Sequence, residues 1–99
     1  MKISYAITVC NEFLEIQKLV TFLLENKRVQ DEIVILYDNK NGDPEVLNYL
    51  LKFDHLPNVQ TWKGFEFDGD FSNWKNLLTT YCGGDYIFQI DADELTKFI

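Results

Sequence analysis

Apolar residues form two kinds of pattern along this chain: short β-rich runs, and longer stretches with apolar positions three and four residues apart. The short runs predict four strands, at residues 3–9, 32–37, 58–62 and 85–90. The stretches between them predict three amphipathic helices. Strands and helices therefore alternate, which is typical of a parallel sheet with helices packed on its faces.

Polar residues mark where the predicted helices begin and end. Asn11 is the expected N-cap of the first helix, and Ser72 that of the third. Asp43 followed by Pro44 predicts the start of the second helix, because proline suits the first helical position. The Gly83-Gly84 pair is expected to stop the third helix.

These elements predict an α/β fold: a single three-layer, Rossmann-like domain over residues 1–99 with a mainly parallel four-stranded sheet. Ligands of such sheets bind beyond the carboxyl ends of the strands. The polar residues found there are Cys10-Asn11-Glu12, Asp38 and Asp91-Ala92-Asp93. We therefore expect the chemistry of this protein at that edge of the sheet.

Net charge narrows the choice of partners. The formal charge is −7, which argues against nucleic acid and against an anionic membrane surface as partners. No apolar run is long enough to cross a bilayer, and the sequence up to Ala6 has the pattern of a strand and not of an export signal. Cys10 and Cys82 are expected to be free thiols used in packing, and we expect a cytoplasmic location.

The sharpest chemical feature is the pair Asp91 and Asp93 at the end of an apolar strand. Hard oxygen ligands select Mg²⁺ or Mn²⁺, which often bridge protein carboxylates to substrate phosphates. The alternative is a solvated acidic turn before another helix. Asp38 by itself is typical of a turn, and its loop does not match a calcium-binding EF-hand, because Tyr37 stands where that motif needs aspartate.

Other residues carry weaker signals. Lys75 on the third predicted helix could pair with a phosphate, although a lone helix lysine is usually solvated. Trp62, Trp74 and the phenylalanines are expected in the core. The sequence contains no glycine-rich phosphate loop, so a metal held by carboxylates is the expected grip on any phosphate.

Three segments, in order, resemble family 2 glycosyltransferases, whose fold is called GT-A. The opening strand and turn at residues 3–12 resemble the start of that family, and residues 69–76 resemble the segment before its third helix. Residues 84–94, Gly-Asp-Tyr-Ile-Phe-Gln-Ile-Asp-Ala-Asp-Glu, are similar to the run that ends in its DxD motif. The resemblance implies the sheet order 3-2-1-4.

The resemblance also implies a function. The family transfers a sugar from a nucleotide-diphosphate donor, with a UDP-sugar as the expected donor here, to an acceptor hydroxyl. The implied acceptor is itself a sugar. The implied donor-binding residues are Thr8, Cys10, Asn11, Glu12, Asp38, Lys75, Asp91, Ala92 and Asp93, with Asp93 and Asp91 at a Mn²⁺ or Mg²⁺ ion.

Two positions depart from the family pattern. Tyr37-Asp38 replaces an Asp-Asp pair, and Lys75 replaces an arginine and so lacks its bidentate fork. The family places its catalytic base after the DxD motif, and no residue of this sequence can be assigned as that base. We therefore expect donor binding without measurable transfer.

A non-catalytic nucleotide-binding or assembly module is the alternative function. An open edge at the fourth strand leads us to expect self-association as a homodimer.

Overall fold

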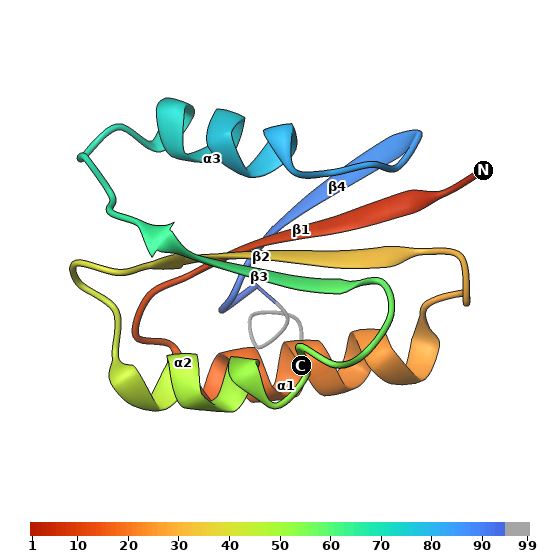
Figure 1. Ribbon diagram of the computed structural model, residues 1–99, viewed down its shortest axis with the longest axis horizontal. Coiled ribbons are helices and arrows are strands. Elements are labelled where there is room, and N and C mark those ends of the chain that lie inside the picture. The colour runs from red at the N-terminus through yellow and green to blue at the C-terminus, as the bar shows by residue number, and fades with distance from the viewer. Residues whose placement is uncertain (95–99) are drawn as a thin grey trace.

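The computed structural model describes residues 1–94 and shows strands and helices alternating along the chain. The four strands are parallel and lie in the order β3-β2-β1-β4. Helices α1 and α2 cover one face of the sheet and α3 covers the other (Figure 1). The elements are β1 (Ile3–Val9), α1 (Phe13–Asn26), β2 (Glu32–Asp38), α2 (Pro44–Leu51), β3 (Val59–Phe65), α3 (Phe71–Thr80) and β4 (Tyr86–Asp91).

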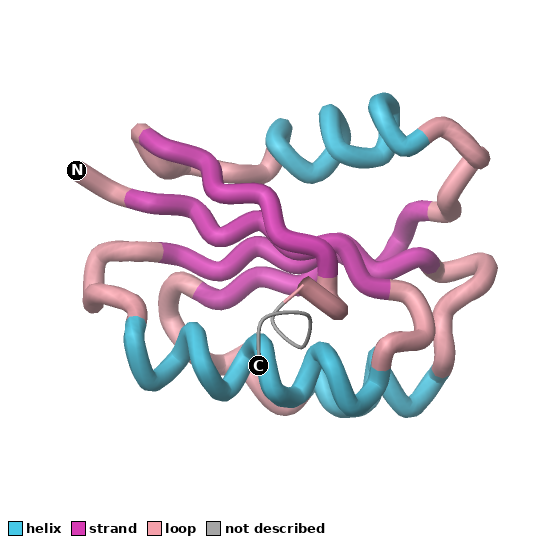
Figure 2. Tube along the Cα trace, turned by 180° about the vertical axis from the view of Figure 1, so that it is seen from behind, coloured by secondary structure: helices cyan, strands magenta, loops and turns pink. Residues whose placement is uncertain are grey.

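The predicted α/β class, three layers and sheet order are confirmed. Figure 2, seen from behind, shows the strands as one twisted layer between the helices. Residues 95–99, which belong to the predicted domain, lie outside the described residues. Across residues 1–94, no helix combines the length and the apolar character needed to cross a membrane.

Two cores, one on each face of the sheet, hold the layers together. Successive strand residues point to opposite faces, so a continuous apolar run such as Ile33–Leu36 supplies both cores at once. All seven residues of β2 are buried. The core under α3 contains Ala6, Val34, Leu36, Trp74 and Leu78, and the larger core under α1 and α2 is built around Ile7, Ile16, Val20, Ile35 and Leu50.

The predicted starts of two helices were wrong. Asp70, not Ser72, caps α3, because its carboxylate accepts from the backbone N–H groups of Ser72 and Asn73 at 2.9 and 3.2 Å. At α1 the N-cap is Glu12, not Asn11, and it makes no side-chain cap hydrogen bond. The predicted cap of α2 is confirmed, since the Asp43 side chain accepts from the backbone N–H of Glu45 at 2.9 Å.

The third strand is longer than predicted. It continues to Phe65 instead of ending at Trp62. The register between β2 and β3 shifts after Leu36 pairs with Trp62, and pairing resumes where Asp38 pairs with Phe65. The backbone N–H of Asn39 donates to the carbonyl of Phe65 at 2.9 Å. The extension brings the β3–α3 loop to the end of β2.

The Gly83-Gly84 pair does not end the helix, since α3 ends at Thr80, and Gly84 is required instead by close packing. A Cβ atom on Gly84 would lie 2.6 Å from Ser4 Oγ and 2.8 Å from the Ser4 backbone nitrogen. The Gly84 N–H donates to Ser4 Oγ at 2.8 Å, and the Gly83 N–H donates to Glu32 Oε2 at 2.6 Å. Gly84 therefore lets the chain pass close to β1 before β4 begins.

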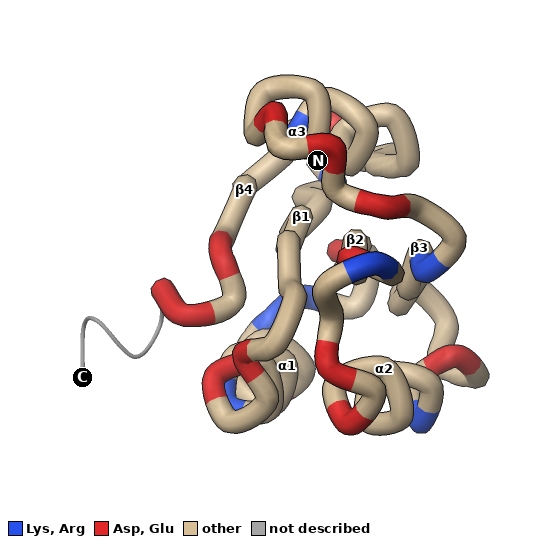
Figure 3. Tube along the Cα trace, turned by 90° about the vertical axis from the view of Figure 1, so that its left-hand side faces the viewer, with Lys and Arg blue, Asp and Glu red and all other residues tan. Residues whose placement is uncertain are grey.

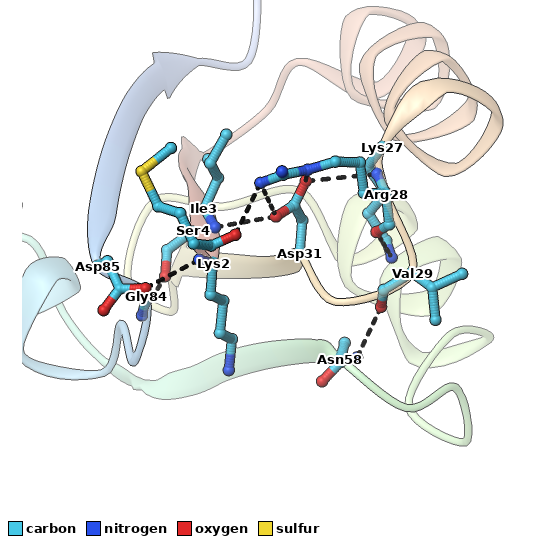
Figure 4. A network of polar contacts seen from close by, with 11 residues as sticks. Lys2, Ile3, Ser4, Lys27, Arg28, Val29, Asp31, Asn58, Gly84 and Asp85 are labelled. Carbon is cyan, nitrogen blue, oxygen red and sulfur yellow. Dashed lines mark hydrogen bonds and ion pairs between the residues drawn. The ribbon is translucent and has the colours of Figure 1, made fainter.

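Buried carboxylates organise the amino ends of the strands, and Figure 4 shows the contacts of one of them, Asp31. Asp31, 1% exposed, accepts from Arg28 Nη2 and Nε at 2.9 and 3.0 Å and from the Ile3 N–H at 2.9 Å. The Arg28 hydrogen bond is the main cause that lowers the pKa of the Asp31 carboxyl to about 2. Burial raises the pKa of Glu32, but hydrogen bonds from Ser4 and Gly83 outweigh it and leave the pKa below its ordinary value.

Strand β4 has neighbours on one side only within the described residues, and it is the least buried strand. Its side chains include Tyr86, Ile87 and Phe88, which are 61%, 37% and 53% exposed. Phe88 and Ile90 also line an apolar groove of about 290 Å³ beside α1. The strand thus presents an apolar edge with unused backbone hydrogen-bonding groups.

The lowered pKa of Asp31 predicts acid sensitivity. An unfolded aspartate titrates near pH 3.9, so the native ion pair contributes stability above that pH and loses it as the pH falls toward about 2. We expect the free energy of unfolding, from urea titrations, to fall between about pH 5 and pH 2. In Asp31→Asn that fall should be smaller and the stability at pH 7 lower. The exposed Asp54→Asn variant is the control, and equal pH dependence in all three proteins would contradict the prediction.

Candidate functional site

A cavity of about 510 Å³ opens at the carboxyl ends of β1, β2 and β4, beside the first turns of α3. Figure 3 looks toward this side of the molecule, with acidic positions in red where β4 ends. This is the edge of the sheet at which the sequence predicts ligand binding. The lining residues are Thr8, Val9, Cys10, Glu12, Asp38, Phe67, Phe71, Trp74, Lys75, Asp91 and Asp93.

The cavity brings together all of the residues predicted for the site except two. Asn11 is exposed and does not line the cavity. Ala92 is fully buried, and it packs in the core under α1 and α2. The parallel register explains the convergence, because Thr8 pairs with Asp91 and Val9 with Tyr37, so the strand ends are level.

Asp38 is the most constrained carboxylate of the cavity. It is 4% exposed. Its Oδ1 accepts from the backbone N–H groups of Lys40, Asn41 and Phe67 at 2.9, 3.3 and 3.2 Å. Its Oδ2 accepts from Asn41 Nδ2 at 2.9 Å and contacts Cys10 Sγ at 4.0 Å. Since a carboxylate offers about four acceptor positions, the protein already fills them.

These hydrogen bonds decide the charge of Asp38. Burial raises the pKa of the carboxyl, but the hydrogen bonds from Asn41, Phe67 and Lys40 outweigh it and keep the pKa below its usual value. Asp38 is therefore ionised at neutral pH. It ties the β2–α2 loop, the β3–α3 loop and the end of β1 to one point.

Gly42 closes the loop that Asp38 holds. Its N–H donates to the Asp38 carbonyl at 2.8 Å, and a Cβ atom there would collide with that carbonyl and with the ring of Tyr37. Tyr37 in turn donates from its hydroxyl to the carbonyl of Asp43 at 3.0 Å. The Tyr37 that departs from the Asp-Asp pair thus helps to fix this loop.

Asp91 lies at the mouth of the cavity and is about half exposed. Its Oδ1 accepts from Thr8 Oγ1 at 3.1 Å and lies 3.9 Å from Lys75 Nζ. Its backbone N–H donates to Glu94 Oε1 at 2.8 Å. The ion pair is long and solvated, so it contributes little to stability and leaves Lys75 able to change partner.

Within residues 1–94, no three histidine, cysteine, aspartate or glutamate side chains gather into a site that could hold a metal ion by themselves. Mg²⁺ and Mn²⁺ sites that act on phosphates commonly use one or two carboxylates and complete their coordination with water and substrate oxygens. Asp91 and Asp93 line the cavity and supply oxygens of that kind. The donor set fits this shared type of metal site.

Cys10 lines the cavity, but its surroundings disfavour a thiolate. Burial raises the pKa of the thiol, and the negative charges of Asp38 and Glu12 raise it further. Glu12 accepts from the backbone N–H groups of Cys10 and Asn11 at 2.8 and 2.9 Å, which fixes the turn after β1. Cys10 therefore shapes the cavity as a neutral side chain.

Sequence reasoning missed the aromatic wall of the cavity, formed by Phe67, Phe71 and Trp74. Trp74 is in the core as expected, but Phe71 is 69% exposed, against the expectation for the phenylalanines. The ring centroids of Phe67 and Phe71 are 4.8 Å apart, and those of Phe67 and Trp74 are 5.7 Å apart. The available signal was spacing, since Phe71 precedes Lys75 by one helical turn.

Comparison with known proteins does not extend this description. No protein-family model matches the chain, and a search of curated proteins found no significant match.

The role of Asp38 gives a testable expectation. Asparagine at this position keeps one acceptor oxygen. Its side-chain amide group, which is a donor, then faces the groups that donate to Oδ2 in the wild type. Because lost hydrogen bonds to a charged group cost about 1.5–3 kcal/mol, we expect Asp38→Asn to reduce the free energy of unfolding by about 2 kcal/mol. Urea denaturation with Asp54→Asn as the exposed control measures this. A variant as stable as the wild type would contradict the role of Asp38 as a structural tie.

Proposed function

We propose that the cavity binds a nucleoside-diphosphate sugar together with Mn²⁺ or Mg²⁺, as the donor-binding part of a glycosyltransferase that moves the sugar to an acceptor hydroxyl. The observation that carries the proposal is the gathering of Thr8, Lys75, Asp91 and Asp93 around one cavity at the carboxyl edge of the sheet. Thr8 lies on β1 and Lys75 on α3, while Asp91 ends β4 and Asp93 follows it. The family resemblance implies all four as donor-binding residues.

Charge supports a need for a cation. Among residues 1–94, the lining includes the carboxylates Glu12, Asp38, Asp91 and Asp93, against the single basic residue Lys75. A diphosphate would add negative charge to this wall. Asp91 and Asp93 would hold a divalent cation, which would offset that repulsion and supply stabilisation for the charge of the departing diphosphate.

The protein's own residues would orient the donor. Thr8 holds the Asp91 carboxylate through its hydroxyl, and Glu94 holds the Asp91 backbone. Lys75 stands 3.9 Å from Asp91, within reach of a phosphate placed beside that carboxylate. It would donate as a point charge, without the planar fork of an arginine.

We also propose that a second copy of the chain is a partner, with β4 pairing with β4 of the other copy. The stretch Tyr86-Ile87-Phe88-Gln89-Ile90 contains no charge and no proline, which are the usual protections of an edge strand. Antiparallel self-pairing centred on Ile87 would put Tyr86 opposite the other copy's Phe88, so two apolar surfaces would meet. Because the chain as a whole carries a net charge of −7, its other surfaces favour repulsion between copies, and the uncharged stretch 86–90 of β4 is where we expect contact.

The metal requirement is tested by titration calorimetry with UDP, in Mn²⁺ and again in EDTA. We expect binding only with the metal, and Asp93→Asn should weaken it by about tenfold or more while shifting the melting temperature by no more than a few degrees. Asp54→Asn is the matched control. Equal affinity with and without metal would refute the proposal, as would an Asp93→Asn variant that binds UDP normally.

Self-association is tested by light scattering at high micromolar concentration. We expect a dimer for the wild type and a monomer for Phe88→Lys, because a charge on the edge strand opposes pairing. Val29→Lys, at a loop position that is 90% exposed, controls for added charge alone. A monomeric wild type would rule out the pairing.

A further inference from the structure

We propose that the cavity holds the base of its nucleotide by stacking on Phe71, and that Asp38, at the end of β2, does not read the edge of the base. Nucleoside diphosphates with different bases should then bind with similar affinity. This inference rests on the proposed function, because it assigns the base within the same cavity.

The first observation is the exposure of Phe71. The side chain lines the cavity yet is 69% exposed, so packing within the chain does not account for it. One neighbour supports the ring, since Phe67 lies 4.8 Å away and in turn contacts the buried Trp74 at 5.7 Å. A planar aromatic ligand on Phe71 would extend this row and remove apolar surface from water.

The second observation is that Asp38 has no acceptor position left. Four N–H donors and the Cys10 thiol surround its two oxygens, and the side chain is 4% exposed. A base could hydrogen-bond to Asp38 only by displacing one of these donors, and it would lose on the protein side what it gained on the ligand side. Asp38 therefore acts as a positioning residue that holds the Phe67 loop in place.

The third observation is the spacing of Phe71 and Lys75 along α3. They are four residues apart and so lie on the same face of the helix, about 6 Å apart along its axis. Lys75 stands beside Asp91, where the phosphates and the metal are proposed to bind. A base on Phe71 and a phosphate at Lys75 would thus be one helical turn apart, with the ribose between them.

Stacking explains why base identity should matter little. Every nucleobase has an aromatic face, so stacking is tolerant of sequence, whereas discrimination needs hydrogen bonds to the base edge. Loss of the aromatic side chain should lower the affinity for any nucleotide by about 5- to 150-fold.

The test is calorimetric titration of UDP, CDP, ADP, GDP and inorganic pyrophosphate, each with saturating Mn²⁺, into four proteins. These are the wild type, Phe71→Ala, Phe71→Tyr and Phe22→Ala. Phe22, on α1, is 47% exposed and outside this cavity, so it controls for the loss of a surface phenylalanine. Melting temperatures of all four check that the variants fold.

We expect the wild type to bind the four nucleotides within about tenfold of one another. Phe71→Ala should lose about 5- to 150-fold for each nucleotide and nothing for pyrophosphate, and Phe71→Tyr should restore binding. Phe22→Ala should bind as the wild type does.

Two results would overturn the inference while leaving nucleotide binding in place: a preference for one base much greater than tenfold, or unchanged nucleotide affinity in Phe71→Ala. If the wild type binds neither the nucleotides nor pyrophosphate, the proposed function fails first and the inference fails with it.

Discussion

Burial of β2 on both faces is the constraint on which the rest of the structure depends. The strand lies between β1 and β3 and is covered by helices on each side, so polar groups at its ends cannot simply turn toward water. Its boundaries nevertheless carry Asp31, Glu32 and Asp38, all of which keep a lowered pKa. A buried ionised carboxylate is tolerated only where hydrogen-bond donors surround it. The neighbouring segments must therefore present donors to both ends of β2.

This requirement shapes the two edges of the sheet differently. At the amino edge, the donors come from Arg28, the start of β1 and the Gly83-Gly84 segment, and together they fix where β4 begins. At the carboxyl edge, the donors come from the β2–α2 loop and the β3–α3 loop. The groups available to a ligand, such as Lys75, Asp91 and Phe71, are instead exposed side chains carried by α3 and β4. The residues that hold the fold together are thus different from those to which the proposed function gives a binding role.

The sequence predicts well those features of the fold that depend on neighbouring residues in the chain. Periodicity along the chain is a local property, and it yields the element order, the layers and the edge where the site lies. The sequence places Asp38 at that edge. It does not predict which groups hydrogen-bond to the Asp38 carboxylate, because one of them, the backbone N–H of Phe67, is distant in sequence. The prediction of the α3 cap was wrong for a related reason. Ser72 and Asp70 are both good caps by composition, and the path of the loop decides between them. The exposure of Phe71 depends on what the rest of the fold leaves uncovered.

Under the proposed function, this arrangement makes binding conditional on a cation. The cavity wall is acidic and belongs to a chain of net charge −7, so a free diphosphate is repelled both locally and at long range. Stacking on an exposed phenylalanine is too weak to overcome that repulsion alone. A divalent ion held by Asp91 and Asp93 would offset most of their charge, and Lys75 and the aromatic wall would then both favour the same ligand. Affinity would then arise from metal and nucleotide together. The nucleotide alone would meet an unfavourable charge, and the metal alone would leave the ring of Phe71 uncovered.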